Sequence, residues 1–212
     1  MRRKNWYLTI GLILTACMLL FTALGIFWTP YSPTAVSAPD RKAPPCTAHP
    51  FGCDQLGRDI LSRTLEGAGA TLTIALAVLA IGAACGLVIG ALCGYFGGPA
   101  DALMMRLCDT VAAFPSVLLA LVVLAVTGPG KYNVIWALGV LFIPSFARLV
   151  RGEFLQYRDR DFVRSARLMG VGSLRVIFVH ILPNTWPTLL SGLPIGFTTA
   201  VLAEASRSNL GI

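Results

Sequence analysis

Five apolar segments of about 20 residues each constrain the fold more than any other feature of the sequence. An α-helix rises about 1.5 Å per residue, so about 20 residues cross roughly 30 Å of hydrocarbon. Hydrophobic residues make up 56% of the 212 residues and charged residues only 13%, which is too few charges for an ordinary soluble domain. The sequence predicts an all-α, polytopic membrane helical bundle with these visible spans: Leu8–Trp28, Ala70–Tyr95, Met104–Thr127, Val134–Val150 and Trp186–Ala203.

The first apolar segment follows a basic N-terminus, so a cleaved signal peptide and a retained helix are both considered. A signal peptide has an apolar region of about 7 to 15 residues, whereas this segment stays apolar from Leu8 to Trp28. Leu14–Cys17 is similar to a lipoprotein cleavage box, but the residues after Cys17 stay apolar. We therefore predict a retained membrane helix.

The positions of the basic residues predict the orientation. The formal net charge is +7, but the basic residues lie between apolar segments instead of on one polar face, which argues against a nucleic-acid partner. With a cytoplasmic N-terminus, eleven of the 17 Lys and Arg residues fall inside and six outside. This distribution follows the positive-inside bias and predicts a multi-pass protein whose N-terminus is cytoplasmic.

The stretch Arg151–Asn184, between the fourth and fifth segments, carries most of the functional information. Asp159 and Asp161 are cap-type carboxylates ahead of a short helical pattern, and Gly170 follows the pattern as a C-cap would. One face of this helix is predicted to carry Phe162, Ser165, Ala166 and Met169. We expect the helix, near residues 162–170, to lie on the inner membrane surface and to suit a groove on a partner. On the residues alone, a solvated basic loop or a helix held by anionic headgroups is an equal alternative.

Ala166, Gly170 and the pair Leu182–Pro183 stand at the spacing of a cytoplasmic signature, EAA…G…I.LP. The chain in this respect resembles permease subunits of bacterial binding-protein-dependent ABC importers. The resemblance implies that Phe162–Gly170 is a coupling helix, which fits a cleft of an ATP-binding subunit and passes nucleotide-driven closure to the membrane helices. It also implies a loop motif, whose residues are Ile181, Leu182 and Pro183.

Three residues depart from that signature. Arg164 stands where the signature has Glu, Ser165 where it has the first Ala, and His180 where it has the first Ile. We expect the docking partner to differ accordingly.

A second block, His49–Asp59, resembles the outside loop of the dipeptide, oligopeptide and nickel permease group. The match continues through Gly94–Gly98, Asp101, Arg106, Phe114–Pro115, His180–Asn184 and Leu202–Ser206. The resemblance implies a subunit that forms half of a pathway for peptides or nickel and metal chelates in the bacterial inner (cytoplasmic) membrane. The implied partners are a second permease subunit, two cytoplasmic ATP-binding subunits, an external solute-binding protein and the lipid membrane.

ATP hydrolysis is expected in a separate subunit, so we predict that this chain is not an enzyme and binds no cofactor. Gly128–Lys131 is similar to a phosphate loop, but Ala125 and Tyr132 occupy positions where that loop needs Gly and Ser or Thr. Clustered intramembrane carboxylates or a filter motif, which would favour an enzyme or a channel, are not found in the sequence.

Residues 1–67 are predicted to form the first transmembrane helix and an external loop, and residues 68–212 the importer transmembrane domain. In the family a sixth span follows, and it is absent from this chain. Arg207, Ser208 and Asn209 also depart from the family pattern before Leu210–Ile212. The alternative to a working permease is therefore a truncated, non-transporting membrane fragment.

Two further groups of residues are candidate sites. Cys46 and Cys53, near His49 and Asp54, are compatible with a disulfide, with free thiols or with a metal site; we predict the disulfide as the leading possibility and no metal site. Glu204, near the outer end of the fifth segment, is an ionisable residue close to lipid. It is a candidate for the translocation pathway, and a structural role at the helix end is equally compatible.

Overall fold

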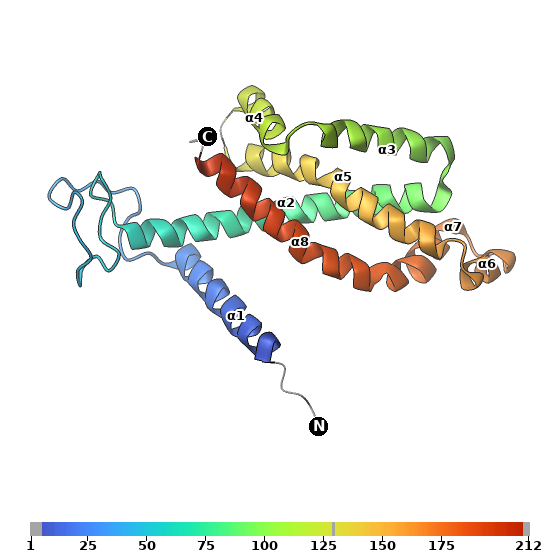
Figure 1. The fold of residues 1–212 in the computed structure, drawn as a ribbon, viewed down its shortest axis with the longest axis horizontal. Coiled ribbons are helices and arrows are strands. Elements are labelled where there is room, and N and C mark those ends of the chain that lie inside the picture. Colours follow the sequence, from blue (N-terminus) through green and yellow to red (C-terminus); the bar gives the residue numbers. More distant parts are fainter. Residues whose placement is uncertain (1–5, 129, 210–212) are drawn as a thin grey trace. The chain divides into compact units, whose positions relative to one another are not determined.

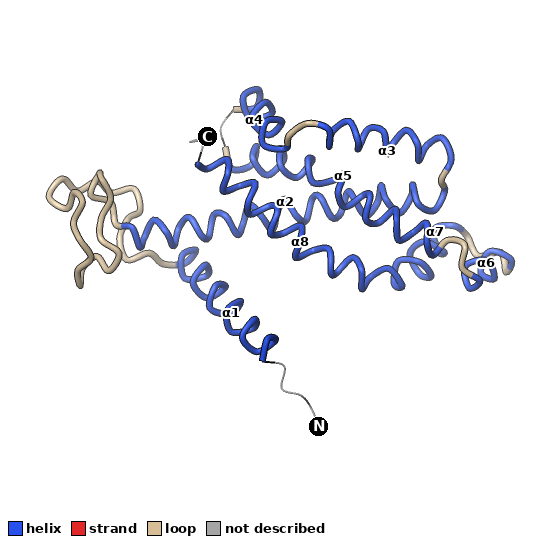
Figure 2. The backbone as a smooth tube through the Cα atoms, in the orientation of Figure 1, coloured by secondary structure: helices blue, strands red, loops and turns tan. Residues whose placement is uncertain are grey.

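The computed structural model describes residues 6–128 and 130–209, and in these ranges the chain is helical with connecting loops (Figure 1, Figure 2). The helices are α1 (Trp6–Phe27), α2 (Ile60–Phe96), α3 (Gly98–Ala113), α4 (Ser116–Thr127), α5 (Lys131–Tyr157), α6 (Asp161–Leu168), α7 (Ser173–Arg175), the π-helix η1 (Val176–Ile181) and α8 (Leu182–Asn209). The predicted all-α membrane fold is confirmed. Pro129, the basic residues Arg2, Arg3 and Lys4, and the end Leu210–Ile212 lie outside the described residues.

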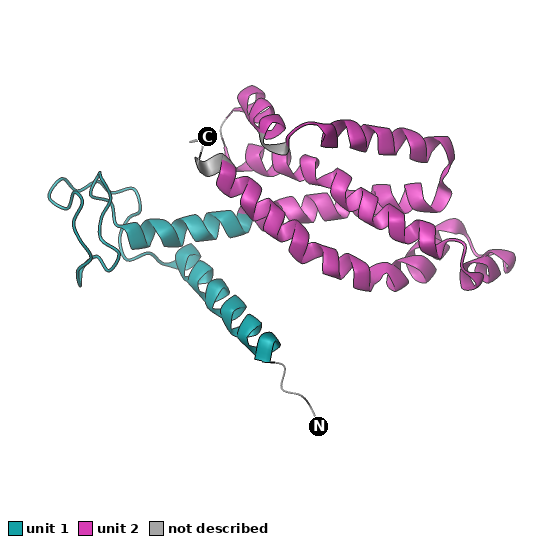
Figure 3. Cartoon of the chain, viewed as in Figure 1, with its two compact units in different colours: residues 1–73 teal, residues 74–212 magenta. Residues whose placement is uncertain are grey.

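The chain divides into two compact units, residues 1–73 and residues 74–212, with the division inside α2 (Figure 3). The first unit holds α1, a long loop and the beginning of α2. The second holds the remaining helices. The functional boundary that the sequence predicts after residue 67 stays a prediction.

Four helical segments in the described ranges are long and apolar enough to cross a membrane. These are α1, α2, α5 and the continuous stretch Ser173–Ser206, which joins α7, η1 and α8. Segments Gly98–Ala113 and Leu118–Thr127 pass the same test only as a pair and meet at a bend of 92°. The length and composition of the helices thus give four spans, or five if the bent pair crosses once.

The prolines predict kinks at Pro115 and Pro144, and at Pro115 the third predicted segment, Met104–Thr127, is divided into α3 and α4. Proline has no N–H to donate and forces the preceding residue out of the helical region. Phe114 accordingly takes an extended conformation (φ −83°, ψ 140°) and ends α3, and Pro115 precedes α4. Pro144 behaves differently, because α5 runs through it without a break.

In the second unit, glycines at every fourth position of α2 bring its backbone against α5. A Cβ built on Gly90 would lie 2.5 Å from the carbonyl oxygen of Ala147, and one on Gly94 would lie 2.5 Å from Cβ of Phe154. Gly82 and Gly86 make similar approaches. Small residues permit such close contact between membrane helices, where packing and not water exclusion holds helices together. The two helices therefore pack with little room for movement.

Two apolar cores lie within the second unit. One joins α2, α4, α5 and α8 around Val78, Leu138 and Phe142. The other joins α2, α5, α6, η1 and α8, and its members are Ala91, Tyr95, Val150, Phe154, Val163, Ala166, Val176, Ile177, Ile181 and Leu189. The second core fixes the position of α6 and is the structural basis of the site described next.

Candidate functional site: the short helix α6

The helix α6 begins without a side-chain cap. Its N-cap is Arg160, which is extended (φ −69°, ψ 149°), and no side chain bonds the free N–H groups there. The predicted capping role of Asp159 is wrong, because its carboxylate instead accepts a hydrogen bond from Nε of Arg158 at 3.3 Å. Asp161 lies in the first turn, where its negative charge favours the positive end of the helix dipole.

The other end of α6 is closed by a Schellman motif. Gly170 has φ +79°, a conformation that glycine adopts without steric cost. Its N–H donates to the carbonyl of Arg167 at 3.0 Å, and the N–H of Val171 donates to the carbonyl of Ala166 at 3.1 Å. The predicted role of Gly170 as a C-cap is confirmed.

The inward face of α6 differs from the predicted grouping of residues. Val163 and Ala166 are buried at 0% and 2% exposure. Phe162 is 42% exposed and Met169 76% exposed, and Ser165 is exposed as well. Of the four residues predicted to share a face, Ala166 differs from the other three, because its small side chain packs into the core together with Val163.

The outward face of α6 is both apolar and basic. Leu168 is 89% exposed and Met169 76% exposed, and Arg164 is exposed beside them. Large apolar side chains on a short surface helix are expected where a partner covers them. This face therefore presents the apolar side chains of Leu168 and Met169 next to the positive charge of Arg164.

Two arginines connect α6 and its approach to the end of α2. The guanidinium carbon of Arg167 lies 4.7 Å from the centre of the Tyr95 ring. Nη1 of Arg158, just ahead of α6, donates to the carbonyl oxygen of Gly94 at 3.4 Å. Both cations thus lie near the last turn of α2, where the helix dipole is negative. Local sequence patterns gave no signal for either contact.

The residues predicted as a loop motif are helical. Ile181 is the last residue of η1 and is fully buried, and Leu182 and Pro183 are the first two residues of α8. The side chain of Asn184 donates to the carbonyl of His180 at 2.6 Å, a bond on the helix surface. The motif therefore lies at a junction between π- and α-helix, inside the core that also holds α6.

An ion pair at the start of α3 was not foreseen from the sequence. Nε of Arg151 donates to Oδ1 of Asp101 at 2.5 Å, and Nη2 donates to Oδ2 at 2.7 Å. Such two-point pairing of guanidinium and carboxylate fixes orientation as well as distance. It attaches α3 to α5 near the end of α2.

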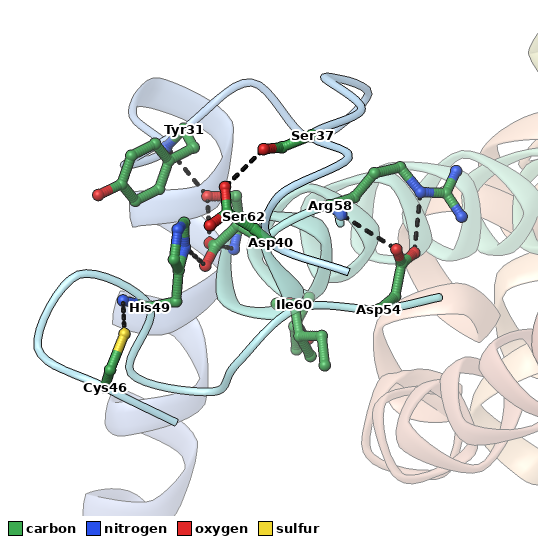
Figure 4. Close-up of polar contacts among 11 residues, drawn as sticks. Tyr31, Ser37, Asp40, Cys46, His49, Asp54, Arg58, Ile60 and Ser62 are labelled. Carbon is green, nitrogen blue, oxygen red and sulfur yellow. Dashed lines mark hydrogen bonds and ion pairs between the residues drawn. The ribbon is translucent and has the colours of Figure 1, made fainter. Parts of the chain in front are cut away.

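The loop of the first unit is organised around Asp54 (Figure 4). Its carboxylate accepts hydrogen bonds from the backbone N–H of Leu56 at 2.8 Å and of Arg58 at 3.0 Å, and from the Arg58 side chain at 2.8 Å. Arg63 also pairs with it. Desolvation raises the pKa of Asp54, but these hydrogen bonds and the charge of Arg58 outweigh it and lower that pKa to about 2.

Asp59 connects the loop to the start of α2, through contacts with His49 and Ser62. Its Oδ2 accepts from the N–H of Ser62 at 2.8 Å and from Oγ of Ser62 at 2.7 Å, as an N-cap carboxylate does. His49 Nδ1 lies 2.9 Å from Oδ1, and the N–H of Tyr31 donates to Oγ of Ser62 at 3.0 Å. Burial raises the pKa of Asp59, but the bonds from Ser62 and His49 leave that pKa below its ordinary value.

The two cysteines of this loop are free thiols in the structure, so it does not contain the predicted disulfide. Cys46 is exposed, and its sulfur accepts a hydrogen bond from the N–H of His49 at 3.3 Å. Cys53 is buried, and burial with nearby carboxylates raises the pKa of its thiol. Within the described ranges, no three His, Cys, Asp or Glu residues gather as a metal site.

Glu204 lies on α8 and is 6% exposed. A buried carboxylate in a membrane helix is compatible with a role in the pathway and with a purely structural role. Its function stays a prediction.

The chain is similar to known membrane components of transport systems. The family described as binding-protein-dependent transport system inner membrane component matches residues 86–212. A protein of Brucella suis biovar 1 (strain 1330) that carries the name of a peptide transport system permease protein is 42% identical over 212 residues. The match covers 100% of this chain and 71% of the relative.

Two further relatives carry related names. The dipeptide transport system permease protein of Alkalihalophilus pseudofirmus is 33% identical over 210 residues, covering 99% of this chain and 69% of the relative. The glutathione transport system permease protein of Shigella dysenteriae serotype 1 is 42% identical over 168 residues, which is 79% of this chain and 55% of the relative.

Several helices long and apolar enough to cross a membrane, with one short exposed helix between two of them, define the class of multi-pass membrane proteins. The chain belongs to the family of binding-protein-dependent transport system inner membrane components. The resemblance seen in the sequence is thereby confirmed at the level of the family.

Proposed function

We propose that this chain is one of two permease subunits of an ATP-driven importer of peptides, in which α6 docks on a cytoplasmic ATP-binding subunit. The observation that carries the proposal is the two-faced character of α6. Its inner residues Val163 and Ala166 are buried in the core, whereas Leu168 and Met169 are exposed. Such a helix can receive a force from a partner and pass it inward.

In this proposal ATP is hydrolysed by two separate subunits, and an external binding protein delivers the solute. The chain contributes half of the pathway and no catalytic group. Membership of a family named for binding-protein-dependent transport supports this division of labour.

The stretch around α6 carries an excess of positive charge, which supports a cytoplasmic location. It contains Arg158, Arg160, Arg164, Arg167 and Arg175 against Asp159 and Asp161. We further propose that α3 and α4 together cross the membrane once, because α6 and the N-terminus then lie on the same, cytoplasmic side. Single cysteines, introduced as Trp6→Cys or Ser165→Cys, can be labelled with a membrane-impermeant reagent to test this orientation. Labelling of one position from outside the cell but not of the other would contradict it.

Peptides are the favoured solute. The relatives reported above are named for peptide, dipeptide and glutathione transport, and these names favour peptides over nickel or metal chelates. Stimulation of ATP hydrolysis by dipeptides, by glutathione and by chelated nickel, each with the binding protein present, separates these substrates.

The docking role is tested by co-expression of the chain with its genomic neighbours, followed by purification and measurement of solute-stimulated ATP hydrolysis. Leu168→Glu places a charge on the exposed apolar face and is expected to abolish capture of the ATP-binding subunit. Leu168→Met, which keeps an apolar side chain, is the matched control and retains capture. Full capture by Leu168→Glu would refute docking through this face. Failure of the unaltered chain to capture any ATP-binding subunit would favour the non-transporting alternative.

A further inference from the structure

The helix α6 contacts α2 directly, although more than sixty residues separate the two contacting side chains, Tyr95 and Arg167. We propose that the contact between Arg167 and Tyr95 is a positioning contact that passes movement of α6 directly to α2. The inference rests on the proposed docking function of α6. In the alternative mechanism, α6 would move the membrane helices only through its covalent connections to α5 and α7.

The geometry of the contact suits this role. A guanidinium within about 6 Å of an aromatic centre is attracted by the negative face of the ring, and the observed distance is 4.7 Å. Tyr95 is only 8% exposed, and its ring meets that of Phe96 edge-on with centres 5.0 Å apart. The ring is therefore held in place by its surroundings, and a displacement of Arg167 acts on α2 rather than on a freely rotating side chain.

The contact does not stand alone. Val163 and Ala166 of α6 lie in the same apolar core as Ala91 and Tyr95 of α2, so the two helices share buried surface as well as the ring contact. Arg158, the C-cap of α5 just ahead of α6, donates a hydrogen bond to the carbonyl oxygen of Gly94. The last turn of α2 thus contacts both α6, through Arg167, and the end of α5 just ahead of α6, through Arg158.

Movement received by α2 would pass to further helices. The close approach of Gly90 and Gly94 to α5 leaves no space for sliding between α2 and α5. The pair Asp101–Arg151 attaches the first turn of α3 to α5. The expected moving unit is therefore α6 with the adjacent ends of α2, α5 and α3.

The test compares four variants in the complex purified with its ATP-binding subunits and reconstituted in vesicles. Arg167→Gln removes the cation, and Arg167→Lys keeps it. Tyr95→Phe keeps the aromatic ring. Arg175→Gln is the charge-matched control, since Arg175 is exposed in α7 and the structure gives it no ring contact or ion pair within the described residues. The readout is solute transported per ATP hydrolysed, with capture of the ATP-binding subunit and thermal stability measured on the same samples.

We expect Arg167→Gln to capture the ATP-binding subunit normally and to lower transport per ATP by about twofold to fivefold, the range that a partly exposed cation–aromatic contact supports. Tyr95→Phe and Arg175→Gln should match the unaltered complex, and Arg167→Lys should recover most of the loss. Equal losses in Arg167→Gln and Arg175→Gln, or a loss in Tyr95→Phe, would overturn the proposal. So would reduced capture or stability sufficient to account for the lost transport. If the unaltered chain neither captures an ATP-binding subunit nor transports, the proposed function itself fails.

Discussion

Substitution of Gly90 by alanine should destabilise the packing of α2 on α5. An alanine Cβ would lie 2.5 Å from the backbone oxygen of Ala147 and 2.7 Å from Cβ of Val150. Ordinary contact begins at 3.4 Å, so the helices would have to separate by roughly 0.9 Å. Because one of the opposing atoms is backbone, rotation of a side chain cannot relieve the clash. Overpacking of this kind costs about 1–3 kcal/mol.

A matched control lies in the same helix. A Cβ on Gly67 meets no atom within 4 Å, so Gly67→Ala removes a glycine from α2 without a clash. Alanine favours a helix over glycine by about 0.8–1 kcal/mol, and this control should be neutral or more stable. Because both substitutions gain the same helix propensity, the two variants should differ by the overpacking cost, about 1–3 kcal/mol in the free energy of unfolding.

The measurement is reversible unfolding of the detergent-solubilised protein by titration with a denaturing detergent, supported by thermal unfolding. For a chain of this size, 1 kcal/mol shifts the midpoint of thermal unfolding by about 2–4 °C, so the difference is easily resolved. Equal stability of Gly90→Ala and Gly67→Ala would refute the argument that close backbone approach holds α2 and α5 together.

Three other perturbations have defined outcomes. Asp101→Asn should cost about 1.5–3 kcal/mol by leaving Arg151 without its charged partner, and a double-mutant cycle with Arg151→Gln should show strong coupling; additive losses would contradict the pairing. Gly170→Ala should cost about 1 kcal/mol because alanine disfavours φ +79°, and Gly170→Asn should cost less; thermal unfolding that ranks them in the reverse order would exclude the left-handed cap. The pKa of Asp54 falls from an ordinary 3.8 to about 2 in the folded loop, so the stability it contributes is present above about pH 4 and is lost as the pH falls through 2. Limited pepsin cleavage of the loop should therefore increase between pH 4 and pH 2. Asp54→Asn should be cleaved more readily at pH 4 and show a smaller step, because the lowered pKa of Asp59 in the same loop still contributes.

Hydropathy located the membrane helices but not their ends. The helix α2 begins at Ile60, ten residues before the apolar segment that predicted it. The intervening Arg63 and Glu66 lower the hydropathy without interrupting the helix, which starts where Asp59 caps the N–H of Ser62. A capping carboxylate is readable in the sequence, but its effect depends on the loop that buries it.

The break at Phe114–Pro115 shows a second limit. Membrane helices tolerate proline in their interior when neighbouring groups accommodate it, as α5 does at Pro144. The same residue type ends α3 at Pro115. The residue type alone therefore does not predict whether a helix ends at a proline or continues through it.

The candidate site shows the same division between local and long-range information. The position of α6 and its glycine end followed from short-range rules of helix capping. Its buried face did not follow from such rules, because Val163 and Ala166 are buried by long-range packing against α2, α5 and η1. The contacts of Arg167 with Tyr95 and of Arg151 with Asp101 join residues at least fifty positions apart, and no periodic pattern predicts such pairs.

The π-helix η1 holds one more residue per turn than the α-helices on either side of it. Residues five apart lie on one face of a π-helix, so Val176 and Ile181 both reach the core, although α-helical spacing would place them about 140° apart. Deletion of a single residue here would convert the π-turn into an α-turn, and the helices on either side would keep their register. Residues 176–181 should therefore tolerate the loss of one residue better than the α-helical part of α8, where a deletion would rotate the rest of the helix by about 100°.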